Sequence, residues 1–128
     1  MPSKNQQKGE EGERRAAAYL QEHGYAVLAR NYRFRRVEID LVCMEVDAGD
    51  SRRGTLVFVE VKSRTSDLFG SPESAVTWPK QKNIILAARA YVFQNHMEGF
   101  PCRFDVITVK TSRTGSEIRH FKDAFHLS

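Results

Sequence analysis

The feature that most constrains the fold is a pair of neighbouring segments with β-strand character. Residues 37–42 alternate strictly between apolar and other side chains, which predicts a strand with Val37, Ile39 and Leu41 on one face. Residues 55–63 begin with apolar side chains on both faces, as in a strand covered from two sides. A sheet buried on both faces needs helices to cover it, so we expect an α/β fold.

The remaining segments extend this pattern to an α-β-β-β-α-β-β order. Residues 9–24 have helical spacing and end at Gly24, and a second helix is expected from Pro79 to before Gly99. The turn-rich residues 47–54 predict an antiparallel hairpin with a loop. Further strands are expected over residues 25–32, 102–110 and 117–121. The predicted fold is therefore α/β, a mixed five-stranded sheet flanked by helices.

Length and composition limit the class of protein. The 128 residues, 41% hydrophobic and 28% charged, suit one globular domain, which we expect over residues 9–128 after a flexible N-terminal arm over residues 1–8. The densest apolar stretch, residues 84–88, is too short to cross a membrane, and the N-terminus has no apolar signal core. A cytoplasmic location without a membrane partner is therefore expected.

The cysteines and histidines form no recognisable site in the sequence. Cys43 and Cys102 are far apart without a CxxC motif, so both are expected to be buried apolar residues. The four histidines, at positions 23, 96, 120 and 126, are scattered and are expected at the surface.

The charge of the chain is compatible with a nucleic-acid partner. The formal net charge is +4 and the isoelectric point is near 9.3. A local arginine cluster with interleaved aromatic residues is predicted to contact phosphates. Its alternative role is a solvated strand edge that discourages aggregation. The cluster consists of Arg30, Arg33, Arg35 and Arg36, with Tyr32 and Phe34 between them.

Charged residues occur at three places where hydrophobic patterning calls for apolar ones. Glu60 and Lys62 end an otherwise apolar strand face. The predicted hairpin can bring Asp40 beside Glu60, and Glu13 lies near the apolar stripe of the first helix. Neighbouring carboxylates repel one another unless a cation lies between them, and oxygen ligands favour a hard ion such as Mg²⁺.

This set of residues suits the hydrolysis of phosphodiesters. We expect Asp40 and Glu60 to bind Mg²⁺ directly, with the Val61 carbonyl as a further ligand and Glu13 bound through water. Mn²⁺ could replace Mg²⁺. Lys62 would orient or polarise the attacking water, and the arginine cluster would hold the nucleic-acid backbone.

The same residues carry a family resemblance over residues 9–125. Glu13, Asp40 and the Glu60-Val61-Lys62 element resemble the PD-(D/E)XK nuclease superfamily. More closely, the chain resembles the bacterial YraN family of predicted endonucleases. The motifs that carry this resemblance are Gly12-Glu13, Arg30-Asn31-Tyr32-Arg33, Glu38-Ile39-Asp40-Leu41, residues 57–64, Phe69-Gly70, Lys80-Gln81 and Arg103-Phe104-Asp105-Val106.

The resemblance implies a restriction endonuclease-like core and a Mg²⁺-dependent DNA endonuclease. It makes Asp40, Glu60 and Lys62 the catalytic core and Glu13 an accessory acid. It also adds three residues to the expected nucleic-acid contacts, namely Arg64, Lys80 and Gln81. By analogy with Holliday junction resolvases of similar size, it implies branched DNA as substrate and a homodimer. Two departures from the family pattern are Val37, where glycine is usual, and the long predicted loop over residues 47–54.

Two other classes of function are compatible with the sequence. One is a non-catalytic nucleic-acid-binding module with the same fold, although clustered carboxylates would repel a phosphate backbone. The other is a protein-interaction domain, whose apolar surface would come from residues 124–127. Motifs for nucleotide or dinucleotide binding and for serine hydrolases are absent from the sequence.

Overall fold

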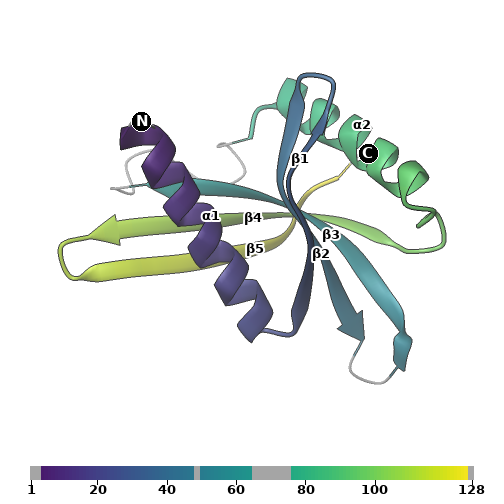
Figure 1. Cartoon of the computed structure of the whole chain (residues 1–128), viewed down its shortest axis with the longest axis horizontal. Helices are drawn as coiled ribbons and strands as arrows, with labels where there is room; N and C mark the ends of the chain where they lie inside the picture. Colours follow the sequence, from purple (N-terminus) through teal and green to yellow (C-terminus); the bar gives the residue numbers. More distant parts are fainter. Residues whose placement is uncertain (1–3, 48–49, 65–75, 127–128) are drawn as a thin grey trace.

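The computed structural model describes residues 4–47, 50–64 and 76–126. Its elements follow the predicted order and confirm the α/β class (Figure 1). They are α1 (Lys4–Glu22), β1 (Tyr25–Phe34), β2 (Val37–Asp47), β3 (Asp50–Arg64), α2 (Trp78–Gln94), β4 (Cys102–Ser112) and β5 (Gly115–Phe125).

The five strands form one mixed sheet in the order β1-β2-β3-β4-β5. Neighbouring strands are antiparallel except for β3 and β4, which are parallel and joined through α2. Pairing of β2 with β3 ends at Leu41 and Val59, whereas β2 stays paired with β1 as far as Val37. The tip of the β1–β2 hairpin therefore separates from the sheet and lies beside α2 (Figure 1).

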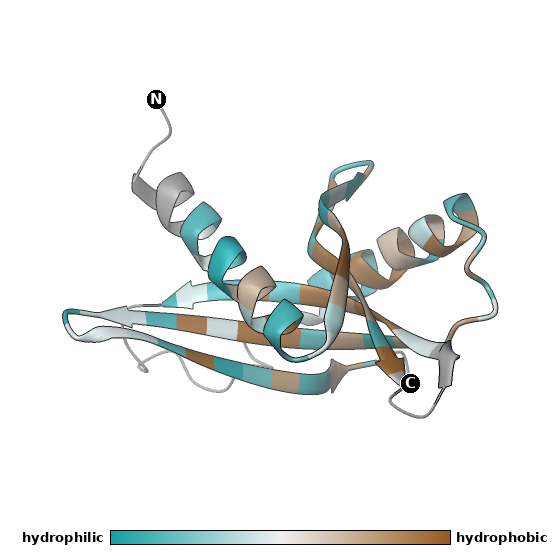
Figure 2. Ribbon diagram, turned by 60° about the horizontal axis from the view of Figure 1, so that its bottom comes forward, coloured by the Kyte–Doolittle hydropathy of each residue, from teal (hydrophilic) through white to brown (hydrophobic). Residues whose placement is uncertain are grey.

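The two helices cover opposite faces of the sheet. Alternate residues of β3 belong to different clusters: Val57 and Val59 pack with α1, and Leu56 and Phe58 pack with α2. This alternation is seen as hydrophobic bands along the central strands in Figure 2. At about 25 cal/mol per Å² of buried apolar surface, these two layers supply most of the driving force for folding.

Several element boundaries differ from the sequence prediction. Helix α1 begins at Lys4 instead of near Gly9, so the helix includes part of the segment assigned to a flexible arm. The predicted loop over residues 47–54 is wrong, because β2 continues to Asp47 and β3 starts at Asp50. Turn-forming residues are no obstacle here, since the long β2–β3 ladder continues to the Asp47–Asp50 pair.

The shared face predicted for Val37, Ile39 and Leu41 is also wrong. Val37 and Ile39 pack in the α2 cluster, whereas Leu41 packs in the α1 cluster. The change occurs at Asp40, where β2 leaves β3. The bend in β2 therefore coincides with a residue expected at the site.

Two burial predictions need correction. Cys43 is buried as expected, but Cys102 is exposed at the start of β4. The side chain of His120, a β5 residue, is only 4% exposed, because it lies against the buried carboxylate of Asp105. Within the described part of the chain, neither helix is long and apolar enough to span a membrane.

Candidate metal centre

Asp40 lies where β2 separates from β3. Beyond the Leu41–Val59 pair, the backbone N–H of Val61 donates to Asp40 Oδ2 at 2.7 Å. A side-chain carboxylate thus accepts a hydrogen bond from a strand whose partner has bent away. The bend of β2 at Asp40 thus places the Asp40 carboxylate against the Glu60-Val61-Lys62 segment.

The environment of Asp40 disfavours its charged form. Burial is the main cause, and the negative charges of Glu60 and Glu13 add to it, so that the pKa of Asp40 is raised to about 8. The hydrogen bond from Val61 acts in the opposite direction but is outweighed. A carboxyl group with a strongly raised pKa beside other acids is a candidate for a functional site.

Two further acids lie beside Asp40. Carboxylate oxygens of Glu13, Glu38 and Asp40 fall within 4.8 Å of one another. Burial is the main reason that the pKa of Glu13 is also raised, with a contribution from the charge of Glu38. Glu13 comes from α1, which approaches β3 closely because residue 12 is glycine; a Cβ there would lie 2.0 Å from Ser63 Oγ.

The Asn31 side chain, on β1, joins Glu13 of α1 to Glu38 of β2. In the amide orientation that satisfies its surroundings, its nitrogen donates to Glu13 Oε2 at 3.0 Å and to Glu38 Oε1 at 2.8 Å. Its φ of 52° lies in the left-handed region, which asparagine adopts more readily than most residues. The amide therefore fixes the positions of two carboxylates.

Glu60 lies on β3 and is only 6% exposed. Its Oε1 is 2.9 Å from Lys80 Nζ and 3.7 Å from Lys62 Nζ. Its other oxygen, Oε2, is buried and has no hydrogen-bond partner among the side chains and backbone groups that the structure describes. An unsatisfied buried carboxylate oxygen is costly, so this atom calls for a ligand.

The two lysines at Glu60 differ in their electrostatics. Burial, followed by the nearby ammonium of Lys80, lowers the pKa of Lys62. Burial also opposes the charge of Lys80, but its contact with Glu60 outweighs this and raises the pKa of Lys80. Lys80 is therefore the firm ion-pair partner of Glu60, and Lys62 is the more readily deprotonated of the two.

These residues fit a divalent cation. Asp40 and Glu60 both provide carboxylate oxygens, and the charge of Glu60 acts on Asp40. Glu60 is not one of the three acids whose oxygens fall within 4.8 Å of one another, but its Oε2 lacks another partner within the described chain. All candidate ligands are oxygens, the donor set of Mg²⁺ and Mn²⁺. The Val61 carbonyl stays a predicted ligand; the contact observed for Val61 is the one from its N–H to Asp40.

Comparison with known proteins identifies the family. Residues 12–109 match the model of "Uncharacterised protein family UPF0102". The chain belongs to this family. UPF0102 is the YraN family, so the resemblance to that family is confirmed. A UPF0102 protein of Chlorobium chlorochromatii is 47% identical over 97% of this chain and 95% of its own length. A UPF0102 protein of Chlorobium phaeobacteroides is 43% identical over 91% of each chain.

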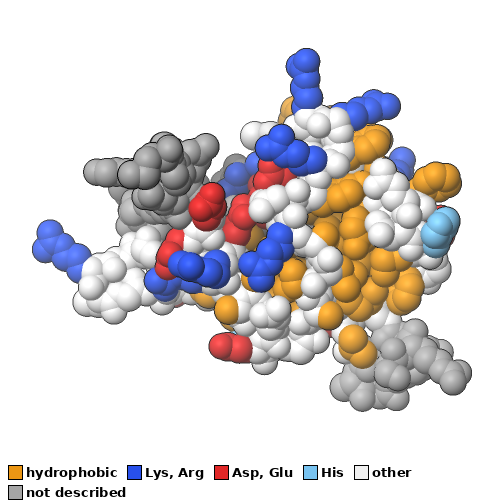
Figure 3. Space-filling model, viewed as in Figure 1, with side chains coloured by type: hydrophobic (Ala, Val, Ile, Leu, Met, Phe, Trp, Pro, Cys, Tyr) orange, Lys and Arg blue, Asp and Glu red, His pale blue; other side chains and the backbone are white. Residues whose placement is uncertain are grey.

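The names of these UPF0102 relatives assign no activity, so function has to be argued from the site. Acidic side chains lie close together on the face shown in Figure 3, with Lys and Arg side chains around them. The resulting surface combines carboxylates that suit a cation with basic groups that suit phosphates.

The predicted nucleic-acid contacts occupy different positions around this UPF0102 site. Arg30 lines a hollow that also includes Glu13 and Asn31. Arg33 pairs with Glu38 at 3.1 Å, and the Arg35 guanidinium lies 5.1 Å from the centre of the Phe34 ring. The remaining members are the exposed Arg36, the half-buried Arg64, Lys80 at Glu60, and Gln81, whose amide donates to the Val76 carbonyl at 2.9 Å.

Two residues of the site were missed as candidates in the sequence. Glu38 shares the alternating pattern with Asp40, so its position two residues away was a usable signal. Asn31 belongs to the Arg30-Asn31-Tyr32-Arg33 motif of the family resemblance and is a poor strand former in the middle of a strand, but neither signal predicts a role at the site. Its contact with Glu13 depends on the approach of α1 and could not be read from the sequence.

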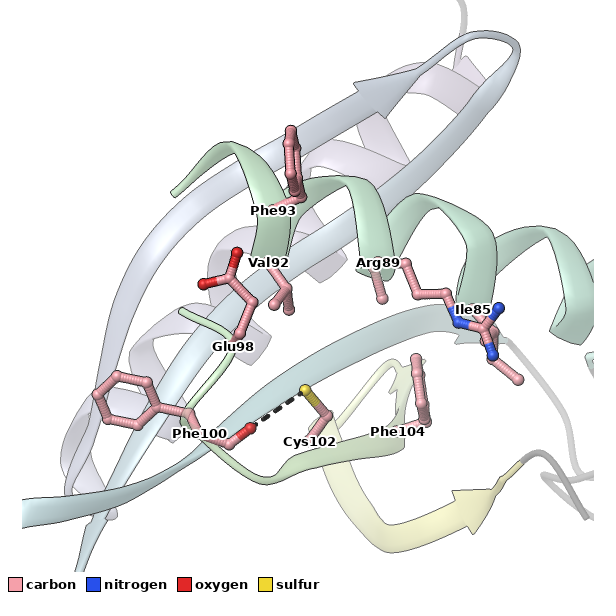
Figure 4. A pocket seen from close by; sticks show the side chains of 9 residues that line it. Ile85, Arg89, Val92, Phe93, Glu98, Phe100, Cys102 and Phe104 are labelled. Carbon is pink, nitrogen blue, oxygen red and sulfur yellow. Dashed lines mark hydrogen bonds between the residues drawn. The ribbon is translucent and has the colours of Figure 1, made fainter. Parts of the chain in front are cut away.

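A separate apolar hollow lies between α2 and β4, and its lining includes none of these acids (Figure 4). Its volume is about 310 Å³, and its lining is mainly apolar, including Val92, Phe93 and Phe104. One cation, Arg89, and one anion, Glu98, are also present. Such a lining provides no group of converging carboxylates, so we place the candidate chemistry at Asp40 and Glu60.

Proposed function

We propose that this UPF0102 chain is a Mg²⁺-dependent DNA endonuclease. The observation that carries the proposal is the buried Glu60 carboxylate, which has one oxygen held by lysines and the other without a partner among the described residues. It acts electrostatically on Asp40, which itself lies against Glu13 and Glu38. A binding module has no physical need for such an arrangement next to phosphates.

Each residue has a distinct part in the proposed reaction. Asp40 and Glu60 would hold the metal, and Glu13 would bind it through water, with Glu38 as a neighbouring acid. When bound, Mg²⁺ supplies stabilisation of charge on the phosphoryl oxygens and favours ionisation of water. Lys80 positions Glu60, and Lys62 would donate a hydrogen bond to the attacking water and so orient or polarise it.

The surrounding basic residues suit the binding of DNA. Arg30 is an exposed cation that lines the Glu13–Asn31 hollow, and Arg35 and Arg36 are exposed at the β1–β2 hairpin tip. Phosphate contacts of this kind position a substrate without reading its sequence. Branched DNA and a homodimer, implied by analogy with the resolvases, are part of this proposal.

The proposal is tested by cleavage of labelled linear, flap, single-stranded and four-way-junction DNAs with Mg²⁺, Mn²⁺ or EDTA. Asp40→Asn and Glu60→Gln are expected to reduce cleavage by about 100-fold or more, because each removes a metal ligand. Glu117→Gln is the matched control. Glu117 is an exposed acid away from the site, and its Oε1 is 3.0 Å from Arg119 Nε.

Binding of the same DNAs is measured in parallel by fluorescence anisotropy, and metal binding by calorimetry. Metal-dependent cleavage that both variants lose would support the proposal. Unchanged DNA binding with neither cleavage nor metal binding would overturn it and favour the non-catalytic binding module.

A further inference from the structure

An exposed tryptophan lies on the helix that also carries Lys80, the ion-pair partner of Glu60. Trp78 is the only tryptophan of the chain and occupies the first turn of α2, where it is 64% exposed. Large aromatic side chains are usually found in cores or at binding surfaces, because leaving them in water forfeits their burial energy. The position of Trp78 therefore calls for a binding partner.

The charges around Trp78 favour an anionic partner. The Lys82 ammonium lies 3.9 Å from the centre of the Trp78 ring, and residues 78 and 82 are one helical turn apart. The sequence of α2 contains Lys80, Lys82 and Arg89 and no acidic residue. A polyanion with flat apolar groups matches this combination of an aromatic ring and cations.

Helix α2 connects Trp78 to the candidate metal centre. Two residues further along the helix, Lys80 reaches Glu60 at 2.9 Å. Residues two apart point to different sides of a helix, so a strand whose phosphate lies near Lys80 and Glu60 would cross the N-terminal end of α2 to place another nucleotide on the indole ring. The same short helical segment serves both contacts.

We propose that Trp78 and Lys82 form a stacking platform for an unpaired base of the DNA substrate. Inside a duplex, each base is stacked between its neighbours and presents only its edges, so an indole ring can stack only on a base that has left the helix. The substrate class is therefore single-stranded DNA or the unpaired nucleotides of a flap or junction. This inference rests on the proposed function, since it names the substrate of the same site.

The sole tryptophan gives a direct measurement. The full chain is titrated in EDTA with single-stranded oligothymidylate and with a duplex of equal length, while indole fluorescence is recorded. We expect quenching by the single strand and little by the duplex, because stacking on a base quenches indole emission. Equal quenching by both, or by neither, would overturn the proposal.

Substitutions test the energy of the contact. Trp78→Ala should weaken single-strand binding about tenfold by anisotropy, and Trp78→Phe should restore part of it. Phe93→Ala is the matched control: Phe93 is an aromatic residue of the same helix, 75% exposed, at the rim of the apolar hollow (Figure 4). If Trp78→Ala leaves DNA binding intact and alters sedimentation or vesicle binding instead, the ring serves a second copy or a lipid surface, and the proposal is wrong.

The two proposals fail in distinguishable ways. Base stacking is measured without metal, so it does not depend on cleavage. Metal-dependent cleavage combined with no effect of Trp78→Ala on single-strand binding would overturn only the stacking platform. Quenching and tenfold weaker binding combined with no cleavage would support the platform and overturn the nuclease.

Discussion

Two aspartates of the same sheet have opposite electrostatic outcomes. Asp105 on β4 is fully buried and accepts hydrogen bonds from Arg103 at 2.9 Å, from His120 at 2.7 Å and from the Asp123 backbone N–H at 3.0 Å. Burial opposes its charge, but these partners outweigh burial and lower the pKa of Asp105. Asp40 on β2 has acidic neighbours instead, and its pKa rises to about 8.

The difference separates an aspartate held by cationic side chains and an N–H donor from one whose charged neighbours are acids. Arg103 extends the Asp105 cluster across the sheet, since it also contacts Glu45 at 2.8 Å and the Tyr25 hydroxyl at 2.9 Å. Around Asp40 and Glu60, the fold brings carboxylates together and leaves one oxygen without a partner among the described residues. Buried charge that is satisfied stabilises a fold, whereas buried charge that is unsatisfied marks a ligand site.

The largest effect is expected at the satisfied aspartate. Asp105→Asn should destabilise the protein by about 3 kcal/mol at neutral pH, because a neutral amide would leave the buried contacts of Arg103 and His120 unsatisfied. Urea unfolding measures this change. A loss below about 0.5 kcal/mol would mean that burial, and not its partners, dominates the energetics of Asp105.

The same substitution should have the opposite sign at Asp40. Asp40→Asn removes a carboxyl that is costly to ionise in the fold, and we expect a gain on the order of 2 kcal/mol at pH 7 to 8 without divalent ions. Urea unfolding in EDTA checks this. Addition of Mg²⁺ should stabilise the wild type and not the variant, because only the wild type retains the ligand.

The pH dependence gives each aspartate its own signature. The folded-state pKa of Asp40 is raised from its ordinary 3.8, so its cost to stability is absent below about pH 4 and grows as the pH rises towards 8. The folded-state pKa of Asp105 is lowered, so its contribution is present at neutral pH and is lost only as the pH falls below 3.8 through that folded-state value. A gain from Asp40→Asn that persists unchanged at pH 4 would contradict this assignment.

The sequence predicted the layered fold and the main acids, but not the networks around them. Alternation and helical spacing are local properties, so the element order and the approach of Asp40 to the Glu60 strand could be anticipated. The burial of His120 depends on the register of β5 against β4, which shifts between Phe104 and Val106. The contact of Asn31 with Glu13 depends on how closely α1 packs at Gly12. Both are tertiary facts that no short segment encodes.

The smallest effect is expected at Lys80, the lysine that pairs with Glu60. It tests whether this ion pair offsets part of the negative charge of the acidic site. The side chain of Lys80 is 41% exposed, so its ion pair with Glu60 is partly screened and should contribute only about 0.5–1 kcal/mol. Lys80→Met should destabilise the wild type by that amount and have little effect in a Glu60→Gln background. Urea unfolding of the two single variants and the double variant closes this cycle. Higher salt should reduce the coupling, as it does for exposed pairs. A coupling near zero would mean that packing alone holds Glu60 in place. The Lys80 ion pair would then contribute nothing to the difference between Glu60 and the fully partnered Asp105, and only the oxygen of Glu60 without a partner would distinguish them.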